Sequence, residues 1–171
     1  YQAKIFGMQH LAITDHGGLY GAIKFYKECK SEGVNPIIGC EIYIAKRSMT
    51  DKDAGVDKEN FHLTLLARDK EGYRNLMKLV TKAHLEGFYY RPRIDKEHLA
   101  KFSGGLIALS GCNSSEISKS FIEGDHKKAQ KLAGEYQQIF GKENFYIEVQ
   151  RLLFDKFATA HEPGREIHTD L

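Results

Sequence analysis

The chain has 171 residues, of which 42% are hydrophobic and 28% are charged, and its net charge is +2 with neutral histidines. That length and apolar content suit one packed domain, and so small a positive charge does not by itself indicate a nucleic-acid-binding protein. The 3 cysteines are an odd number at irregular spacing, which argues against a disulfide framework and favours a reducing, cytoplasmic location. The apolar runs are shorter than the roughly 20 residues of a membrane helix, so we expect no membrane contact.

The first half of the chain alternates between short apolar runs and amphipathic segments. Residues 8–14 form an apolar run typical of a buried strand. Residues 19–32 carry apolar side chains at helical spacing and are followed by a glycine, which predicts a helix. A second strand is predicted over residues 37–45, a polar loop over 46–60 and a third strand over 61–67.

The second half continues with helices that begin at capping residues. Asp69 can cap a helix that ends at Gly87, and a loop rich in tyrosine and arginine follows over residues 88–94. A fourth strand is predicted over 105–110. The remaining predicted elements are a short helix capped by Ser114 or Ser115, a longer helix between Asp125 and Gly141, and a fifth strand over 144–150.

Strands separated by helical segments predict βα units, a mostly parallel sheet and an α/β fold class. Right-handed crossovers then leave a doubly wound sheet or a barrel, and both gather functional groups at the carboxyl ends of the strands. One connection departs from this rule, because no helix separates the strand over 37–45 from the strand over 61–67. We therefore allow that these two strands are antiparallel, or that the loop returns the third strand to the same rim.

Four residues of metal-ligand type lie in or next to these predicted strands: His16, Glu41, His62 and Cys112. Imidazole, carboxylate and thiol groups together form a donor set that zinc and similar divalent ions accept, so their convergence would make a metal-dependent enzyme site. Each residue taken singly also has an ordinary alternative. A glutamate on an edge strand can face solvent, a core histidine is usually hydrogen-bonded, and a lone cysteine packs as a small hydrophobe.

Two further groups of polar residues have both a functional and a structural interpretation. Asp15 precedes His16, where its carboxylate can hold the tautomer of the imidazole, or can instead cap the following helix. Arg91 and Arg93 lie among tyrosines in the predicted loop over 88–94, which suits phosphate contacts and base stacking. The alternative is a solvated loop whose tyrosines pack inward.

The segments that carry these residues resemble one known family. The order, spacing and flanking residues of three stretches are similar to the PHP (polymerase and histidinol phosphatase) domain, in the version that bacterial DNA polymerase III alpha subunits carry. These stretches are LAITDHGGLYGAIKFYKECKSEGVNPIIGCEIYIA, the segment from NFHLTLLARDKEGYRN to GGLIALSGC, and ENFYIEVQ. The resemblance implies a distorted (βα)7 barrel of the TIM-like type. It also implies a cluster of up to three divalent ions, zinc or manganese, at the carboxyl ends of the strands.

The same resemblance implies a role for each candidate residue. The metal ligands would be His16, Glu41, His62 and Cys112. Glu41 would also bridge two ions as a catalytic carboxylate, with Asp15 as a further catalytic residue that supports its neighbouring ligand. The two arginines of the loop, Arg91 and Arg93, would contact a substrate phosphate.

The activity that the resemblance implies is that of a metal-dependent phosphoesterase or a 3′–5′ proofreading exonuclease. It would act on the primer 3′ end of DNA, within a DNA-directed DNA polymerase that works in DNA replication with other replicase subunits. Two alternatives stay open. The chain could be a catalytically inactive structural or interaction domain of the polymerase, or a free-standing PHP phosphatase acting on a small phosphate ester.

The resemblance also predicts which part of the family domain this chain covers. Residues 1–150 are expected to be a partial PHP domain without its first strand, because the His-x-His motif of that strand has no match here. A late Asp-x-His motif has no match either, so we expect a truncated domain with little nuclease activity of its own. Residues 151–171 match poorly and are expected to be a tail or an incomplete last element.

Overall fold

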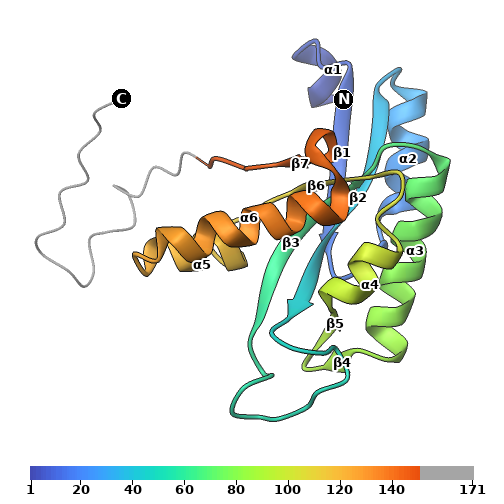
Figure 1. The fold of residues 1–171 in the computed structure, drawn as a ribbon. Helices are drawn as coiled ribbons and strands as arrows, with labels where there is room; N and C mark the ends of the chain where they lie inside the picture. Colours follow the sequence, from blue (N-terminus) through green and yellow to red (C-terminus); the bar gives the residue numbers. More distant parts are fainter. Residues whose placement is uncertain (151–171) are drawn as a thin grey trace, which may run out of the picture.

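The structure is a computed structural model that describes residues 1–150, as a mixed sheet with helices packed against it (Figure 1). Its first half comprises α1 (Gln2–Ile5), β1 (His10–His16), α2 (Ala22–Ser31), β2 (Asn35–Ala45), β3 (Asn60–Ala67) and α3 (Lys70–Leu85). Its second half comprises β4 (Phe88–Tyr89), β5 (Arg91–Ile94), α4 (Lys96–Lys101), β6 (Leu106–Leu109), α5 (Glu116–Ile122), α6 (His126–Phe140), the 3-10 turn η1 (Lys142–Asn144) and β7 (Phe145–Tyr146). None of the helices within residues 1–150 is long and apolar enough to cross a membrane.

The strands form one sheet in the order β4-β5-β2-β3-β6-β7, and β1 also pairs with β2. β1 and β5 share one edge of the long strand β2, and both run parallel to it. β3 runs antiparallel to β2 and to β6. The allowance for an antiparallel pair is therefore confirmed, while the prediction of a mostly parallel sheet is only partly right. The reason is the connection between β2 and β3, which contains no crossover helix and so reverses the chain direction.

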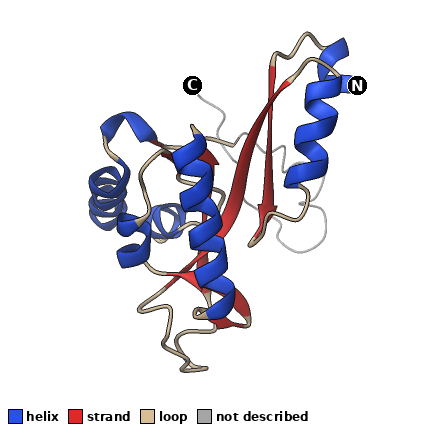
Figure 2. Ribbon diagram, turned by 90° about the vertical axis from the view of Figure 1, so that its right-hand side faces the viewer, coloured by secondary structure: helices blue, strands red, loops and turns tan. Residues whose placement is uncertain are grey.

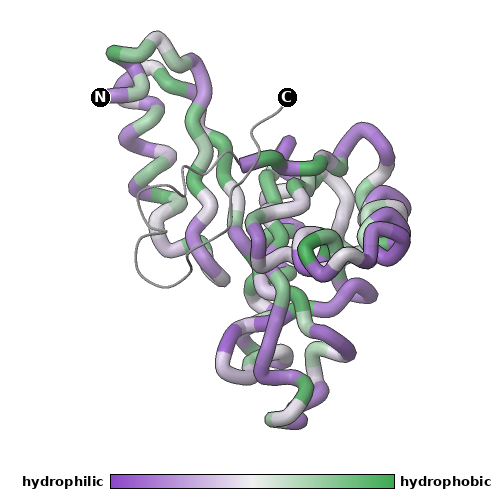
Figure 3. The backbone as a smooth tube through the Cα atoms, turned by 90° about the vertical axis from the view of Figure 1, so that its left-hand side faces the viewer, coloured by the Kyte–Doolittle hydropathy of each residue, from purple (hydrophilic) through white to green (hydrophobic). Residues whose placement is uncertain are grey.

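The helices cover one face of this sheet, and the hydrophobic core lies between the helices and the sheet. Figures 1 and 2 show α2 and α3 along the same side of the long strands β1 and β2. Figure 3 shows hydrophobic and hydrophilic stretches alternating along α2, as expected for a helix with one buried side. Because side chains alternate across a strand, every second residue of β2 points to the helices. The core residues from β2, α3 and α6 are Cys40, Ile42, Ile44, Leu76, Leu79, Tyr136 and Phe140.

Three helices begin at residues that the sequence marks as caps: Asp69, Ser115 and Asp125. In each, the side chain accepts a hydrogen bond from the backbone N–H three residues further on, at 2.9–3.1 Å. This backbone hydrogen bond is the main reason why the pKa of the Asp69 carboxyl lies below its usual value. Gly141 follows α6 with a φ of 85°, which confirms the predicted stop.

The observed elements differ from the predicted ones where the local pattern is short. Residues 88–94 form the hairpin of β4 and β5 rather than a loop, and β7 covers only part of the predicted strand over 144–150. The 4-residue helix α1 and the 6-residue helix α4 have no counterpart in the predicted elements. Helices of this length are not stable through local propensity, so periodicity gives little signal for them. The expected tail over 151–171 lies outside the described residues.

Candidate metal centre

Three of the candidate ligands lie on the sheet face that the helices leave open. His16 ends β1 and lies beside Glu41 of β2 in the parallel register. Tyr43 follows Glu41 by two residues in β2. His62 of β3 lies opposite Tyr43, along the other edge of β2. Because directly paired residues share a face, and residues two apart in a strand also share one, all four side chains lie on the same side of the sheet. The pairing register therefore brings together residues that are far apart in the sequence.

The donor atoms of His16, Glu41 and His62 all lie within 4.8 Å of one another. Glu41 is central, because its Oε1 lies 2.6 Å from His62 Nδ1 and 3.7 Å from His16 Nδ1. The side chains of Glu41 and His62 are only 18% and 21% exposed, whereas that of His16 is 59% exposed. The mostly buried carboxylate is thus paired, which offsets the desolvation cost that a lone buried charge carries.

Cys112 joins this group from the turn that follows β6. Its Sγ lies 3.7 Å from His62 Nδ1. The turn is tied to β3, because the backbone N–H of His62 donates to the carbonyl of Ser114 at 3.2 Å, and the N–H of Ser115 donates to the carbonyl of Cys112 at 2.9 Å. Gly111 has a φ of 84° and lies so close to the carbonyl of His62 that a side chain there would be crowded. Cys112 therefore lies next to His62, beside the group of three donors that His16, Glu41 and His62 form.

The donor set and its spacing fit a divalent ion. Zinc–ligand bonds of about 2.0–2.3 Å place two donors of one ion about 3–4 Å apart. The separations of 3.7 Å, from His16 Nδ1 to Glu41 Oε1 and from Cys112 Sγ to His62 Nδ1, lie within that range. The contact of 2.6 Å between His62 and Glu41 is a hydrogen bond. The described residues therefore contain a group that could hold a metal ion.

Tyr43 is a site residue that the sequence reasoning missed. Its ring centroid lies 5.2 Å from that of His62 and 6.5 Å from that of His16, so it packs against both imidazoles. The residue is only 8% exposed. The guanidinium of Arg91 lies over the same ring, 5.7 Å from its centroid. The signal that could have found Tyr43 is its position two residues after Glu41 in a strand, which puts both on one face.

The turn after His16 is held in place by a histidine of α3. His84 of α3 forms a hydrogen bond of 2.8 Å through its Nε2 with the carbonyl of Gly17. Gly17 has a φ of 63°, and a Cβ atom there would overlap Pro92 and the ring of Tyr43. A glycine is therefore needed for the close packing of this turn against the site.

Asp15 does not support His16 as predicted, and it is not the N-cap residue of α2 either, which is Gly21. In β1, Asp15 lies beside Cys40 of the helix-covered face, while His16 lies beside Glu41 of the open face. The Oδ2 atom of Asp15 accepts a hydrogen bond of 2.8 Å from the backbone N–H of Gly21, just before α2. Since neighbouring residues of a strand point to opposite faces, Asp15 cannot orient the imidazole next to it.

The two arginines of the β4–β5 hairpin have different surroundings. Arg91 is exposed and lies over Tyr43, so it is placed near the site. Arg93 is fully buried, and the predicted phosphate contact of Arg93 is wrong. Its guanidinium donates to four backbone carbonyls at 2.8–3.2 Å. They belong to Gly87, Met49, Asp51 and Asp57. Arg93 therefore anchors the loop between β2 and β3 to β5.

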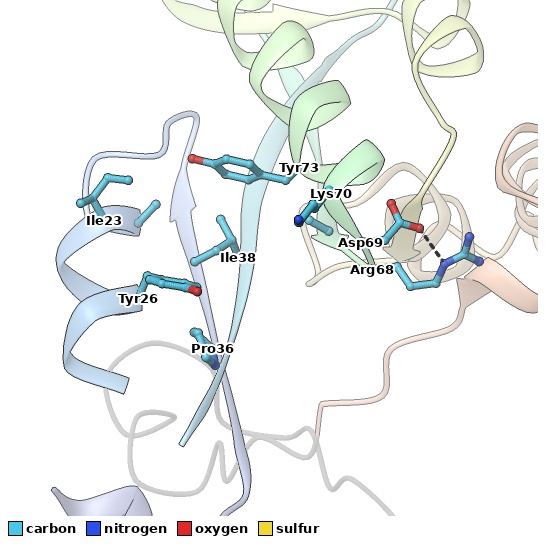
Figure 4. A pocket seen from close by; sticks show the side chains of 10 residues that line it. Ile23, Tyr26, Pro36, Ile38, Arg68, Asp69, Lys70 and Tyr73 are labelled. Carbon is cyan, nitrogen blue, oxygen red and sulfur yellow. Dashed lines mark hydrogen bonds and ion pairs between the residues drawn. The ribbon is translucent and has the colours of Figure 1, made fainter. Parts of the chain in front are cut away.

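A separate groove lies on the helix-covered side of the sheet, between α2 and the start of α3 (Figure 4). Its volume is about 400 Å³, and its apolar lining includes Ile23, Tyr26, Pro36, Ile38 and Tyr73. Arg68 and Asp69 at its border pair with each other at 3.4 Å. Ile38 lies on the opposite face of β2 from Glu41, so this groove does not open onto the candidate ligands.

Iodoacetamide is expected to modify Cys112 well before Cys29 or Cys40. Cys112 is partly exposed, whereas the other two are buried, and burial raises the pKa of the Cys40 thiol to about 12. The thiolate is the reactive form, so a buried thiol with a raised pKa reacts slowly. Mass spectrometry of the native chain measures the order of labelling, and Cys112→Ser is the control that should remove the early adduct. Early modification of Cys40 would contradict the packing described above.

The family model described as "PHP domain" matches residues 1–152 of the chain. The chain belongs to the PHP domain family. This match covers all the strands and candidate ligands described above, and it confirms the family that the sequence motifs indicate. The open mixed sheet of residues 1–150, with helices on one face, is the part of a PHP-type α/β fold that the structure describes.

The chain is similar to curated proteins named DNA polymerase III subunit alpha. The identity is 44% over 149 residues with the protein of Treponema pallidum, covering 86% of this chain and 13% of that protein. The corresponding values are 47% over 151 residues, 88% and 13% for Borreliella burgdorferi, and 49% over 142 residues, 82% and 12% for Thermus aquaticus. The chain thus spans only 12–13% of the length of these relatives.

Among solved structures, a proposed metal-dependent phosphoesterase from Bifidobacterium adolescentis matches 81% of this chain and 76% of its own chain. The sequence identity is 12% and the TM-score is 0.39. We draw nothing further from a likeness this weak.

Proposed function

We propose that this chain is part of the PHP domain of a bacterial DNA polymerase III alpha subunit, and that in the intact domain its metal centre serves hydrolysis of phosphodiester bonds at the 3′ end of DNA. The observation that carries the catalytic part is the convergence of His16, Glu41 and His62 on one open sheet face, with Cys112 beside them. Identity of 44–49% with named alpha subunits supports the parentage.

The donor types support a divalent ion, and zinc is the better choice over manganese. Zinc accepts imidazole, carboxylate and thiolate, whereas manganese prefers oxygen ligands. When bound, such an ion polarises a phosphoryl oxygen and lowers the pKa of its water. We assign the ligand role to His16, Glu41, His62 and Cys112.

Each residue contributes to this function through its position. Glu41 lies between the two imidazoles, so its carboxylate can serve more than one ion, as the family resemblance implies. His16 is the most exposed of the three, so a substrate can reach it. Arg91 keeps its proposed phosphate contact, because its exposed guanidinium lies over Tyr43 beside the site.

The proposed parentage implies partners and a location. The domain would act on the primer 3′ end within a DNA-directed DNA polymerase, together with other replicase subunits in the cytoplasm. The similarity to alpha subunits supports this assignment, which depends on the longer protein that those relatives represent.

The test uses the full gene product that contains this chain. Metal-dependent release of nucleotides from a 3′-labelled single strand is expected to fall by at least about 100-fold in Glu41→Gln, because loss of a ligand exceeds the 10–100-fold cost of losing a ligand's supporting partner. Primer extension should be unchanged, and Glu97→Gln on the exposed side of α4 is the matched control.

The other outcomes separate the alternatives. Unchanged nucleotide release in Glu41→Gln would contradict the catalytic role and favour an inactive structural domain. Hydrolysis of a small phosphate ester such as histidinol phosphate, without any action on DNA or primer extension, would contradict the parentage and favour a free-standing phosphatase.

A further inference from the structure

The turn between β4 and β5 presents a tyrosine in an unusual backbone conformation. Tyr90 has a φ of 59° and is the one non-glycine residue with positive φ in the part of the chain that the structure describes. A bulky side chain there costs free energy, and turns of this kind usually use glycine or asparagine. The side chain is nevertheless 57% exposed, so the protein core does not require the ring.

The ring of Tyr90 is held in place by its neighbours. It packs edge-on against the ring of Tyr89, with centroids 4.8 Å apart. Tyr89 in turn lies under the buried guanidinium of Arg93, which is 5.2 Å from its ring centroid. The hairpin pairs Phe88 with Pro92 and Tyr89 with Arg91, which fixes the turn between them. Tyr90 is thus an exposed aromatic ring on a rigid support.

One cation lies over this ring, and a second follows it directly in the sequence. The Lys58 ammonium lies 5.4 Å from the centroid of Tyr90, on the loop that Arg93 anchors beside the hairpin (Figure 1). Arg91 follows Tyr90 directly and lies over Tyr43, whose ring packs against His62. Arg91 therefore connects the turn, through its contact with Tyr43, to the candidate metal centre.

Of the acidic residues near this turn, Asp53 is exposed and accepts a hydrogen bond of 2.8 Å from the backbone N–H of Gly55. Asp57 is buried and pairs with Arg47, and Glu59 pairs with Lys46 at 2.8 Å. Exposed rings next to cations are how proteins bind single-stranded nucleic acids, because bases stack on the rings while phosphates contact the cations. A peptide partner would instead call for a continuous apolar groove or an unpaired sheet edge.

We propose that Tyr90 is a stacking platform for a nucleobase of single-stranded DNA whose phosphates contact Lys58 and Arg91. The choice of DNA as ligand rests on the proposed function. The platform would hold the strand next to the metal centre, so it concerns substrate binding and not the chemical step. Phe88, which is 51% exposed on the same hairpin, offers a second ring beside it.

The test measures binding of a short fluorescent oligothymidylate to the chain by anisotropy, with a chelator present so that no metal takes part. Tyr90→Asn is expected to weaken binding by about fivefold or more, since it removes one base-stacking ring. Asparagine tolerates positive φ, so this variant should fold at least as well as the wild type, which a thermal melt checks. Tyr90→Phe keeps the ring and should bind within about twofold of the wild type.

Two controls test whether the loss of oligonucleotide binding comes from the missing Tyr90 ring. Tyr26→Ala removes a half-exposed tyrosine from α2, away from the hairpin, and should leave binding unchanged. An oligonucleotide with abasic sites keeps its phosphates, so it should bind the wild type about as weakly as the intact strand binds Tyr90→Asn. The variant itself should not distinguish the two strands.

Three results would contradict the proposed stacking role of Tyr90. These are wild-type affinity in Tyr90→Asn, equal loss in Tyr26→Ala, or no binding by the wild type at millimolar protein. Because this assay is free of metal, it is independent of the hydrolysis test. A chain that binds DNA through Tyr90 but belongs to a protein without 3′ hydrolysis would refute only the proposed function.

Discussion

His62→Ala is expected to weaken zinc binding to the chain by at least about 100-fold, more than the loss of a partner that only supports a ligand. His62 is the link between the other donors, because its Nδ1 lies 2.6 Å from Glu41 Oε1 and 3.7 Å from Cys112 Sγ. Without the His62 imidazole, Cys112 is separated from the Glu41 carboxylate, and only Glu41 and His16 remain as neighbouring donors. Competition with a chromogenic zinc chelator measures the affinity.

The matched control for this prediction is His126→Ala. His126 begins α6 and is exposed, and its ring contacts Phe121 rather than the metal donors. This variant should bind zinc as the wild type does. Equal affinity of the wild type and His62→Ala would show that the four donors do not act as one site, while a loss shared by both variants would point to a nonspecific effect of histidine removal.

Arg93→Ala is expected to lower the free energy of unfolding by about 3 kcal/mol or more. The substitution removes a fully buried guanidinium that donates to four backbone carbonyls, of which that of Gly87 keeps the backbone N–H of residue 93 as a donor at 3.4 Å. Unpaired buried carbonyls each carry a desolvation cost, and the loop between β2 and β3 loses its anchor on β5. For a domain of this size the melting temperature should fall by roughly 10 °C.

The matched control for this loss is Arg91→Ala, two residues away in the same strand. Arg91 is exposed, so its removal should change the free energy of unfolding by less than about 0.5 kcal/mol. Arg93→Lys should recover little, because one ammonium cannot reproduce the fork of donors. Urea denaturation and thermal melts compare the variants, and similar curves for Arg91→Ala and Arg93→Ala would contradict the buried role of Arg93.

Local rules were sufficient for the helices α2, α3, α5 and α6. The caps at Asp69, Ser115 and Asp125 and the stop at Gly141 were predictable, because each depends on contacts within a few residues. The strands that carry the ligands were also predictable, since their apolar runs are long and bounded by polar segments. Short elements such as α4 and the β4–β5 hairpin were not, because they depend on distant packing partners.

The candidate site was predictable as a set of residue types but not as an arrangement. His16, Glu41, His62 and Cys112 could be chosen from their chemistry and from the family resemblance. Tyr43 was missed because an aromatic residue in an apolar strand gives no chemical signal by itself. Only the antiparallel pairing of β2 with β3 puts its ring against His62.

The sequence by itself determined the family, the order of the longer strands and helices and the choice of four candidate donors, because these depend on residue type and local spacing. The tertiary structure decided which neighbours take part. Asp15 is turned away from the site by strand alternation and accepts a hydrogen bond from the backbone N–H of Gly21, although it lies next to His16. Arg91 and Arg93 share one strand face, yet only Arg93 is buried, because the loop between β2 and β3 closes over its guanidinium. Contacts between distant segments give the two members of each pair different surroundings, and no local sequence pattern encodes those contacts.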